Sequence, residues 1–237
     1  MNKRPVKVIA CATVIEEMLP IMPEGMPYEV LDFGLHLAPN RLKETLQAAI
    51  DRAGQEAQTV ILGYGLCSLA VVGLKATNCT LVVPRVDDCI AIFLGSSTAY
   101  QTQASKEPGT YYLTKGWIKV SDTLLDEYNR TVERYGKEQA ERVMSIMLRH
   151  YKRLVYINTG QDDQDRYREY ARRTARQFKL RFEEIDGSDA LIRKTLFGPW
   201  DGDFVVTPPG QTIAYADFKT APPILENSDR TGTARNV

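Results

Sequence analysis

Residues 59–67 read TVILGYGLC, and residues 80–89 read TLVVPRVDDC. Each segment begins with a run of apolar and β-branched residues, which is typical of a buried strand, and continues into a short loop that ends in cysteine. Between residues 40 and 53 the apolar residues recur at helical spacing, which predicts an amphipathic helix capped by Asn40. Strands that alternate with helices pair in parallel, so the sequence predicts an α/β fold. The strands predicted for this half are 6–11, 28–33, 59–63 and 80–83.

The second half of the chain shows a similar succession. Strand-like runs occupy residues 153–157, 180–185 and 204–207. Before them, apolar residues at helical spacing on both sides of Gly136 predict a pair of helices. We therefore expect two Rossmann-like lobes with parallel sheets, joined by a helical pair. The expected parts are a first lobe with a metal site (1–118), connecting helices (119–152), a second lobe (153–221) and a flexible tail (222–237).

The composition narrows the possible partners. Thirty Lys and Arg residues balance thirty Asp and Glu residues, so we expect no polybasic surface for nucleic acid or for an anionic membrane. No apolar run approaches the roughly 18 residues that cross a bilayer, and we expect a cytoplasmic protein without a membrane partner. The basic string from Arg166 to Arg181 contains Glu169, which predicts a solvated helix face.

Four side chains that bind soft or borderline metals follow the predicted strands of the first lobe. They are Cys11, His36, Cys67 and Cys89. Because the carboxyl ends of parallel strands share one edge of a sheet, we expect these side chains to converge. Thiolates and imidazole suit zinc or iron, and three protein ligands with one open position are typical of a catalytic site.

The ligands are expected to be His36, Cys67 and Cys89 before Cys11, and the cofactor to be zinc. Iron or an iron–sulfur cluster is the alternative cofactor. A second interpretation is that the cysteines only pack, because free cysteine is among the most buried residue types. Four cysteines are in any case too few for a disulfide scaffold in a chain of 237 residues.

Residues around Cys89 bear on its reactivity. Asp87 is expected to cap a helix that starts there, and a cysteine in a first helical turn has a lowered thiol pKa, which favours the thiolate. Arg85 either binds a substrate carboxylate or pairs with a neighbouring acid. Cys79 precedes its strand and is expected to be structural, and His150 is expected to be solvated or to interact with the C-terminal dipole of its helix.

Small and polar residues in the loops of both lobes are expected to hold a small-molecule ligand in a cleft between the lobes. Glycines let a backbone approach a bound group, although the same residues are common in ordinary turns. Neither a G-x-G-x-x-G sequence nor a P-loop follows the first strand, so a usual dinucleotide or P-loop site is not predicted. The expected ligand-binding residues are Gly63, Gly65, Arg85, Asp88, Gly95, Ser96, Thr159 and Gly160.

Several short motifs together carry a resemblance that spans about residues 6–214. They are Cys11, Leu35-His36 with Pro39, Gly63-Tyr-Gly-Leu-Cys67, Pro84-Arg85, Asp88-Cys89, Leu94-Gly-Ser96, Tyr112, Gly116-Trp117, Asn158-Thr-Gly160 and Pro208-Pro-Gly210. In this set the chain resembles the domain-of-unknown-function family numbered 1638 (DUF1638). That family often has a histidine where this sequence has Asp87, which removes one candidate imidazole ligand. The resemblance implies an association with methyltransferases of methylated amines in corrinoid-dependent methyl metabolism, and it implies no established reaction.

Three kinds of function fit these features. The first is a metal-dependent transferase or accessory protein of one-carbon metabolism, in which a metal-bound thiolate or water is the nucleophile. The second is a non-catalytic protein that carries a ligand or docks onto a corrinoid protein or methyltransferase. The third is an iron–sulfur redox protein, whose brown colour would distinguish it from a colourless zinc protein.

Overall fold

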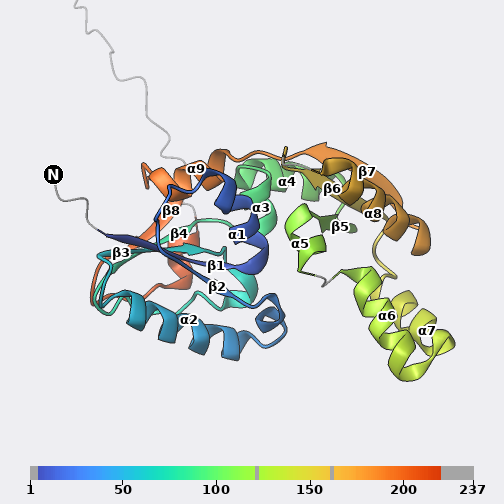
Figure 1. Cartoon of the computed structure of the whole chain (residues 1–237), viewed down its shortest axis with the longest axis horizontal. Coiled ribbons are helices and arrows are strands. Elements are labelled where there is room, and N and C mark those ends of the chain that lie inside the picture. The colour runs from blue at the N-terminus through green and yellow to red at the C-terminus, as the bar shows by residue number, and fades with distance from the viewer. Residues whose placement is uncertain (1–4, 121–122, 161–162, 220–237) are drawn as a thin grey trace, which may run out of the picture.

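The computed structural model describes residues 5–120, 123–160 and 163–219, which form two sheets covered by helices (Figure 1). The first sheet has the strand order β2-β1-β3-β4-β8, and the second has the order β5-β6-β7. All neighbouring strands pair in parallel except β8, which runs antiparallel to β4. The predicted α/β class with parallel sheets is therefore confirmed. The strands are β1 (Val6–Cys11), β2 (Tyr28–Leu31), β3 (Thr59–Gly63), β4 (Thr80–Pro84), β5 (Thr110–Leu113), β6 (Arg153–Asn158), β7 (Arg181–Asp186) and β8 (Phe204–Thr207).

Helices connect the strands in most of the crossovers. The α-helices are α1 (Ala12–Met18), α2 (Pro39–Ala53), α3 (Cys89–Phe93), α4 (Ser97–Lys106), α5 (Lys115–Lys119), α6 (Leu124–Tyr135), α7 (Lys137–Met147), α8 (Gln164–Gln177) and α9 (Ala190–Phe197). The 3₁₀ helices are η1 (Leu19–Ile21), η2 (Phe33–Leu37), η3 (Cys67–Leu69) and η4 (Tyr215–Phe218). Within these described residues, none of the helices combines the length and the apolar character that a bilayer crossing requires.

Helix α2 shows how the pattern of apolar residues sets the local structure. Leu42, Leu46 and Ile50 recur at helical spacing and are completely buried against the sheet. The expectation that Asn40 caps this helix is wrong, because the helix already begins at Pro39 and the capping position, Ala38, offers no side-chain acceptor. Proline is favoured at the first position of a helix because a backbone N–H at that position would have no acceptor within the helix, so nothing is lost when it is absent.

One predicted strand, and one strand that the sequence did not predict, lie in a different sheet from the one that the expected lobes imply. The run 204–207 was expected in the second lobe, but as β8 it pairs with β4 in the first sheet. Strand β5 falls inside the segment 1–118, yet it pairs with β6 in the second sheet. The larger hydrophobic core also contains Val155 and Ile157 from β6, and Trp117 packs against both cores. Two separate lobes are therefore not clearly shown, and the expected lobe boundaries stay a prediction.

The predicted helical pair is present as α6 and α7, which lie together at one end of the molecule (Figure 1). Gly136 separates them with a φ of +82°, a conformation that glycine adopts at little cost. Residues 222–237, the expected flexible tail, lie outside the described residues.

Candidate functional site

Three of the predicted metal ligands meet at the carboxyl edge of the first sheet. Cys11 is the last residue of β1, Cys67 begins η3 after β3, and Cys89 begins α3 after β4. All three thiols are buried, with 2%, 7% and 8% of each residue exposed. The thiols interact electrostatically with one another, and the pKa of the Tyr64 hydroxyl is raised first by burial and then by all three thiols. Interactions of this kind fall off with distance, so we treat these three thiols and Tyr64 as one group, the thiol cluster.

Backbone contacts between two loops hold Cys67 in this position. The Leu66 N–H donates to the Val86 carbonyl at 2.9 Å, and the Cys67 N–H donates to the Asp87 carbonyl at 3.3 Å. A Cβ atom on Gly65 would lie 2.8 Å from the same Val86 oxygen, so this position requires glycine for the close approach of the loops. Cys67 itself has a φ of +26°, a strained value for a residue with a side chain.

The thiol pKa values differ from the sequence-based expectation. Burial raises the pKa of Cys67 to about 12 and raises the pKa of Cys89 well above its ordinary value. The predicted lowering at Cys89 is wrong because the loss of water around the thiolate outweighs the nearby backbone N–H groups. The cap of α3 is also Asp88 rather than Asp87, since its Oδ1 accepts from the Ile90 N–H at 2.8 Å. Without a metal, these thiols are protonated at neutral pH.

His36 reaches the thiol cluster through an aromatic stack. Its ring lies 5.0 Å from the Phe33 ring and 6.0 Å from the Tyr64 ring, measured between centroids. Its Nδ1 lies 2.9 Å from the Phe33 carbonyl oxygen, and because a carbonyl only accepts, this nitrogen carries the proton. A histidine held by such a bond is typical of metal ligands. Over the described ranges of the chain, however, no three His, Cys, Asp or Glu side chains are already arranged to hold a metal ion.

Sequence reasoning missed Tyr64, which stands between the two glycines of the GYGLC motif. Its hydroxyl is buried and has no hydrogen-bond partner among the described residues. A buried polar atom without a partner is costly, and here it adjoins three thiols. The sequence did contain a signal for this residue, because Tyr64 directly follows a buried strand and stands next to predicted ligand-binding glycines.

Several of the predicted ligand-binding residues make defined contacts within the fold. A Cβ on Gly63 would lie 2.6 Å from the Ala10 Cβ, so this glycine allows close strand and helix packing. Arg85 donates through Nη2 to the Phe204 carbonyl at 3.1 Å, beside β8. The Ser96 hydroxyl caps α4 by accepting from the Ala99 N–H at 3.1 Å. Asp88 caps α3, and Gly95 packs against Ser188.

Thr159 and Gly160 do line a cavity, which we call the polar cavity. Its volume is about 360 Å³, within the range of small-molecule sites. Glu17, on α1, contributes a carboxyl group from a residue that is only 4% exposed. Burial raises the pKa of Glu17, while the Thr159 hydroxyl and the Lys115 ammonium act in the opposite direction. The cavity is lined by Glu17, Pro20, Ile21, Lys115, Thr159, Gly160, Ser188, Asp189 and Ile192.

Glu17 was also missed by sequence reasoning. It stands in a short acidic stretch, Glu16-Glu17, and nothing in the local sequence distinguishes the buried carboxyl from its partly exposed neighbour. The two carboxyl groups differ in burial only because α1 packs against α5 and against the loop after β6. The remaining cysteine and histidine, which were not expected to be ligands, also lie where predicted. Cys79 is buried near Gly54, and His150 is exposed and accepts a hydrogen bond from Arg149.

The comparisons with known proteins give one match. The model of a protein family described as a protein of unknown function (DUF1638) matches residues 30–196. The matched segment contains His36, Cys67 and Cys89, whereas Cys11 and Glu17 precede it. No curated protein and no solved structure shows significant similarity to the chain.

Proposed function

This chain belongs to the DUF1638 family, for which no function is described, and from its geometry we propose that it is a metal-binding protein with a separate site for a small molecule. The metal is held by the thiolates of Cys11, Cys67 and Cys89, and zinc is the expected ion. The observation that carries the proposal is that three buried thiols stand at the ends of three neighbouring strands and interact electrostatically with one another and with one buried hydroxyl.

The chemistry of these groups fits a soft or borderline ion. Thiolates select zinc, copper(I) or iron–sulfur clusters over hard cations. A bound cation removes the thiol protons and so reverses the effect of burial on the thiol pKa. Because the described residues hold no preformed group of three ligands, binding requires the side chains to move until the sulfur atoms reach a common ion. The imidazole of His36, next to Tyr64, supplies the fourth ligand or lines the open position.

The metal content of anaerobically purified protein tests this proposal. About one zinc ion per chain is expected in the native protein, and it should be lost in Cys67→Ser and in Cys89→Ser. Cys79→Ser is the matched control, because that buried thiol lies before β4, at the opposite end of the strand from Cys89. Circular dichroism checks that all variants fold. Metal retained in both Cys67→Ser and Cys89→Ser, or no uptake of zinc by the reduced native protein, would overturn the proposal.

The same samples separate zinc from iron. A colourless protein with zinc supports the proposal as stated, whereas a brown protein with iron and acid-labile sulfide assigns the iron–sulfur alternative. Replacing His36 by Gln tests whether the imidazole is the fourth ligand of the ion. If the imidazole is bound to the ion, the variant should bind zinc more weakly, by about one order of magnitude or more.

The small molecule is proposed to lie in the polar cavity. Support comes from the position of Thr159 and Gly160 after β6, where ligands of parallel sheets commonly lie, and from the buried carboxyl of Glu17. A role in corrinoid-dependent methyl metabolism, through a corrinoid protein or a methyltransferase, remains a proposal that rests on the family resemblance. Co-elution of the purified proteins in size-exclusion chromatography would test that partnership.

A further inference from the structure

A second hollow lies between α5 and α8, and we call it the α5–α8 groove. Its volume is about 840 Å³, more than twice that of the polar cavity. It borders the polar cavity, because the Lys115 ammonium, which lines that cavity, lies 5.9 Å from the centre of the Tyr167 ring. The groove is lined by Ile118, Lys119, Arg166, Tyr167, Glu169, Tyr170 and Arg173.

The groove has an excess of positive charge that nearby carboxylates leave uncompensated. Lys119 pairs with Glu16, and Glu169 pairs with Arg176 at 2.6 Å. Arg166 and Arg173 form no ion pair with a carboxylate in the part of the chain that the structure describes. Their guanidinium groups lie 5.8 Å and 5.4 Å from the centres of the Tyr167 and Tyr170 rings.

Two neighbouring arginines of α8 contact other side chains than Arg166 and Arg173 do. Arg168, which points away from the groove, is held by Glu184 at 2.6 Å. Arg172 lies over the Phe182 ring at 5.2 Å, on the side of β7. The sequence pattern predicts a solvated helix face, and Arg166, Arg172 and Arg173 are exposed, but they differ in the side chains that they contact. Arg172, like Arg166 and Arg173, has no ion pair with a carboxylate among the described residues, but it does not line the groove, whereas Arg166 and Arg173 do.

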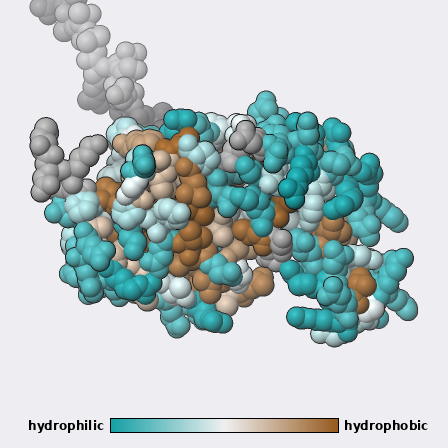
Figure 2. All heavy atoms as spheres, in the orientation of Figure 1, coloured by the Kyte–Doolittle hydropathy of each residue, from teal (hydrophilic) through white to brown (hydrophobic). Residues whose placement is uncertain are grey.

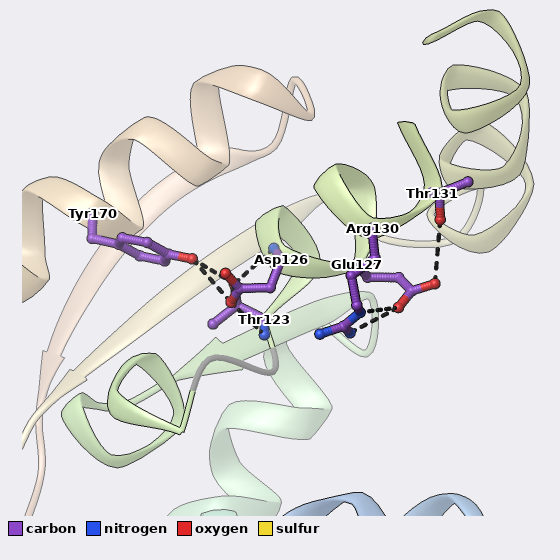
Figure 3. A network of polar contacts seen from close by, with 6 residues as sticks. All are labelled: Thr123, Asp126, Glu127, Arg130, Thr131 and Tyr170. Carbon is purple, nitrogen blue, oxygen red and sulfur yellow. Dashed lines mark hydrogen bonds and ion pairs between the residues drawn. The ribbon is translucent and has the colours of Figure 1, made fainter. Parts of the chain in front are cut away.

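One wall of the groove is fixed by a network at the start of α6 (Figure 3). The Tyr170 hydroxyl lies 2.6 Å from the Thr123 Oγ1 and donates to the Asp126 Oδ2 at 3.3 Å. Thr123 and Asp126 also form the capping box of α6, so this end of the helix is itself well defined. Figure 3 shows the Tyr170 side chain extending from α8 to these two residues. A ring held in this way costs little further entropy when a ligand binds.

The position of the groove in the fold, like its positive charge, favours the binding of an anionic ligand. Helix α5 follows β5 and α8 follows β6, so the groove lies near the carboxyl edge of the second sheet, where α/β proteins bind ligands. The planar guanidinium group matches two oxygens of a phosphate. We propose that the α5–α8 groove binds a phosphate-bearing ligand through the guanidinium groups of Arg166 and Arg173. The groove is lined by different residues from the metal centre and from the polar cavity that it borders.

Titration of the full chain with inorganic pyrophosphate, followed by NMR or calorimetry, tests this site. Arg166→Gln and Arg173→Gln should each weaken binding by about tenfold or more, because each removes a charged hydrogen-bond donor. Arg172→Gln is the matched control, since it removes the same charge from the same helix outside the groove, and it should change binding by less than about threefold. Higher salt should weaken binding of the native protein.

Two results would overturn the site. One is the absence of pyrophosphate binding together with the absence of binding to vesicles that contain phosphatidic acid. The other is equal weakening by all three arginine substitutions, which would indicate an unspecific charge effect. The vesicles also identify the source of the phosphate. Pyrophosphate binding without vesicle binding assigns a soluble ligand, and vesicle binding that requires Arg166 and Arg173 assigns a lipid headgroup.

Discussion

The carbonyl oxygen of Thr13 lies 2.5 Å from the position that a Cβ atom on Gly116 would occupy. Helix α1, which follows β1 of the first sheet, is thus in close contact with α5, which follows β5 of the second sheet. The Thr13 hydroxyl also lies 3.2 Å from the Cys11 sulfur, and Glu17 stands one turn further along α1. One short helix therefore connects the thiol cluster, the polar cavity and the second sheet. Hydrophobic residues form a band across the middle of the face that Figure 2 shows, where α1 and the first sheet lie in Figure 1.

Gly116→Ala should loosen the contact between α1 and α5. The added Cβ would meet backbone atoms of Thr13, which cannot rotate away, and overpacking of this kind costs about 2 kcal/mol in the free energy of unfolding. Urea denaturation measures the effect. Gly202→Ala is the control, because a Cβ there meets no atom within 4 Å, and it should be nearly neutral. Equal stability of the two variants would contradict the close contact.

The reduced, metal-free protein should lose stability at alkaline pH. In the unfolded chain a thiol deprotonates near its ordinary pKa of 9.0, whereas burial raises the folded pKa of Cys67 to about 12. A raised thiol pKa contributes stability below pH 9, and that contribution is lost as the pH rises toward 12. Unfolding free energies measured across this window should fall less steeply for Cys67→Ser. Parallel curves for the two proteins would show that this thiol is not shielded from water.

Glu17 should make a similar contribution at lower pH. Burial raises its pKa above the ordinary 4.5, so its protonated form favours the folded state and the stability that it contributes declines as the pH rises through the folded pKa. Relative to the native protein, Glu17→Gln should therefore become progressively more stable as the pH rises from 4.5 through the raised folded pKa. Glu16→Gln, one residue earlier and partly exposed, is the control for removing a carboxylate from the same helix. A constant difference between Glu17→Gln and the native protein would contradict the buried position of the carboxyl.

Trp117 should be more important for stability than a partly exposed residue usually is. Its ring packs edge-on against Phe33 at 6.0 Å and Phe93 at 5.6 Å, and it contacts both hydrophobic cores. Trp117→Ala should lower the free energy of unfolding by about 3 kcal/mol. Tyr135→Ala, at a ring that is 69% exposed, should change it by less than about 0.5 kcal/mol. Thermal unfolding of both variants compares the two sites, and similar losses would argue against a joint role of Trp117 in the cores.

The sequence by itself determined the α/β class, most of the strands and the placement of three cysteines and one histidine after strands of the first sheet. These features depend on hydrophobic periodicity and on residues adjacent in the chain, such as Cys11 directly at the end of β1. Because parallel strands end at one edge, the meeting of Cys11, Cys67 and Cys89 followed from local information together with one rule of sheet geometry.

Only the tertiary structure decided which sheet β5 and β8 join, because pairing depends on contacts between residues far apart in the chain. The same holds for the raised pKa of Cys89, since burial is a property of everything packed around the thiol. Glu17 differs from Glu16, and Arg166 and Arg173 differ from Arg168 and Arg172, only through the elements that lie against them. The sequence specifies the type of each side chain. Its electrostatic environment depends on the distant segments that pack around it and exclude water.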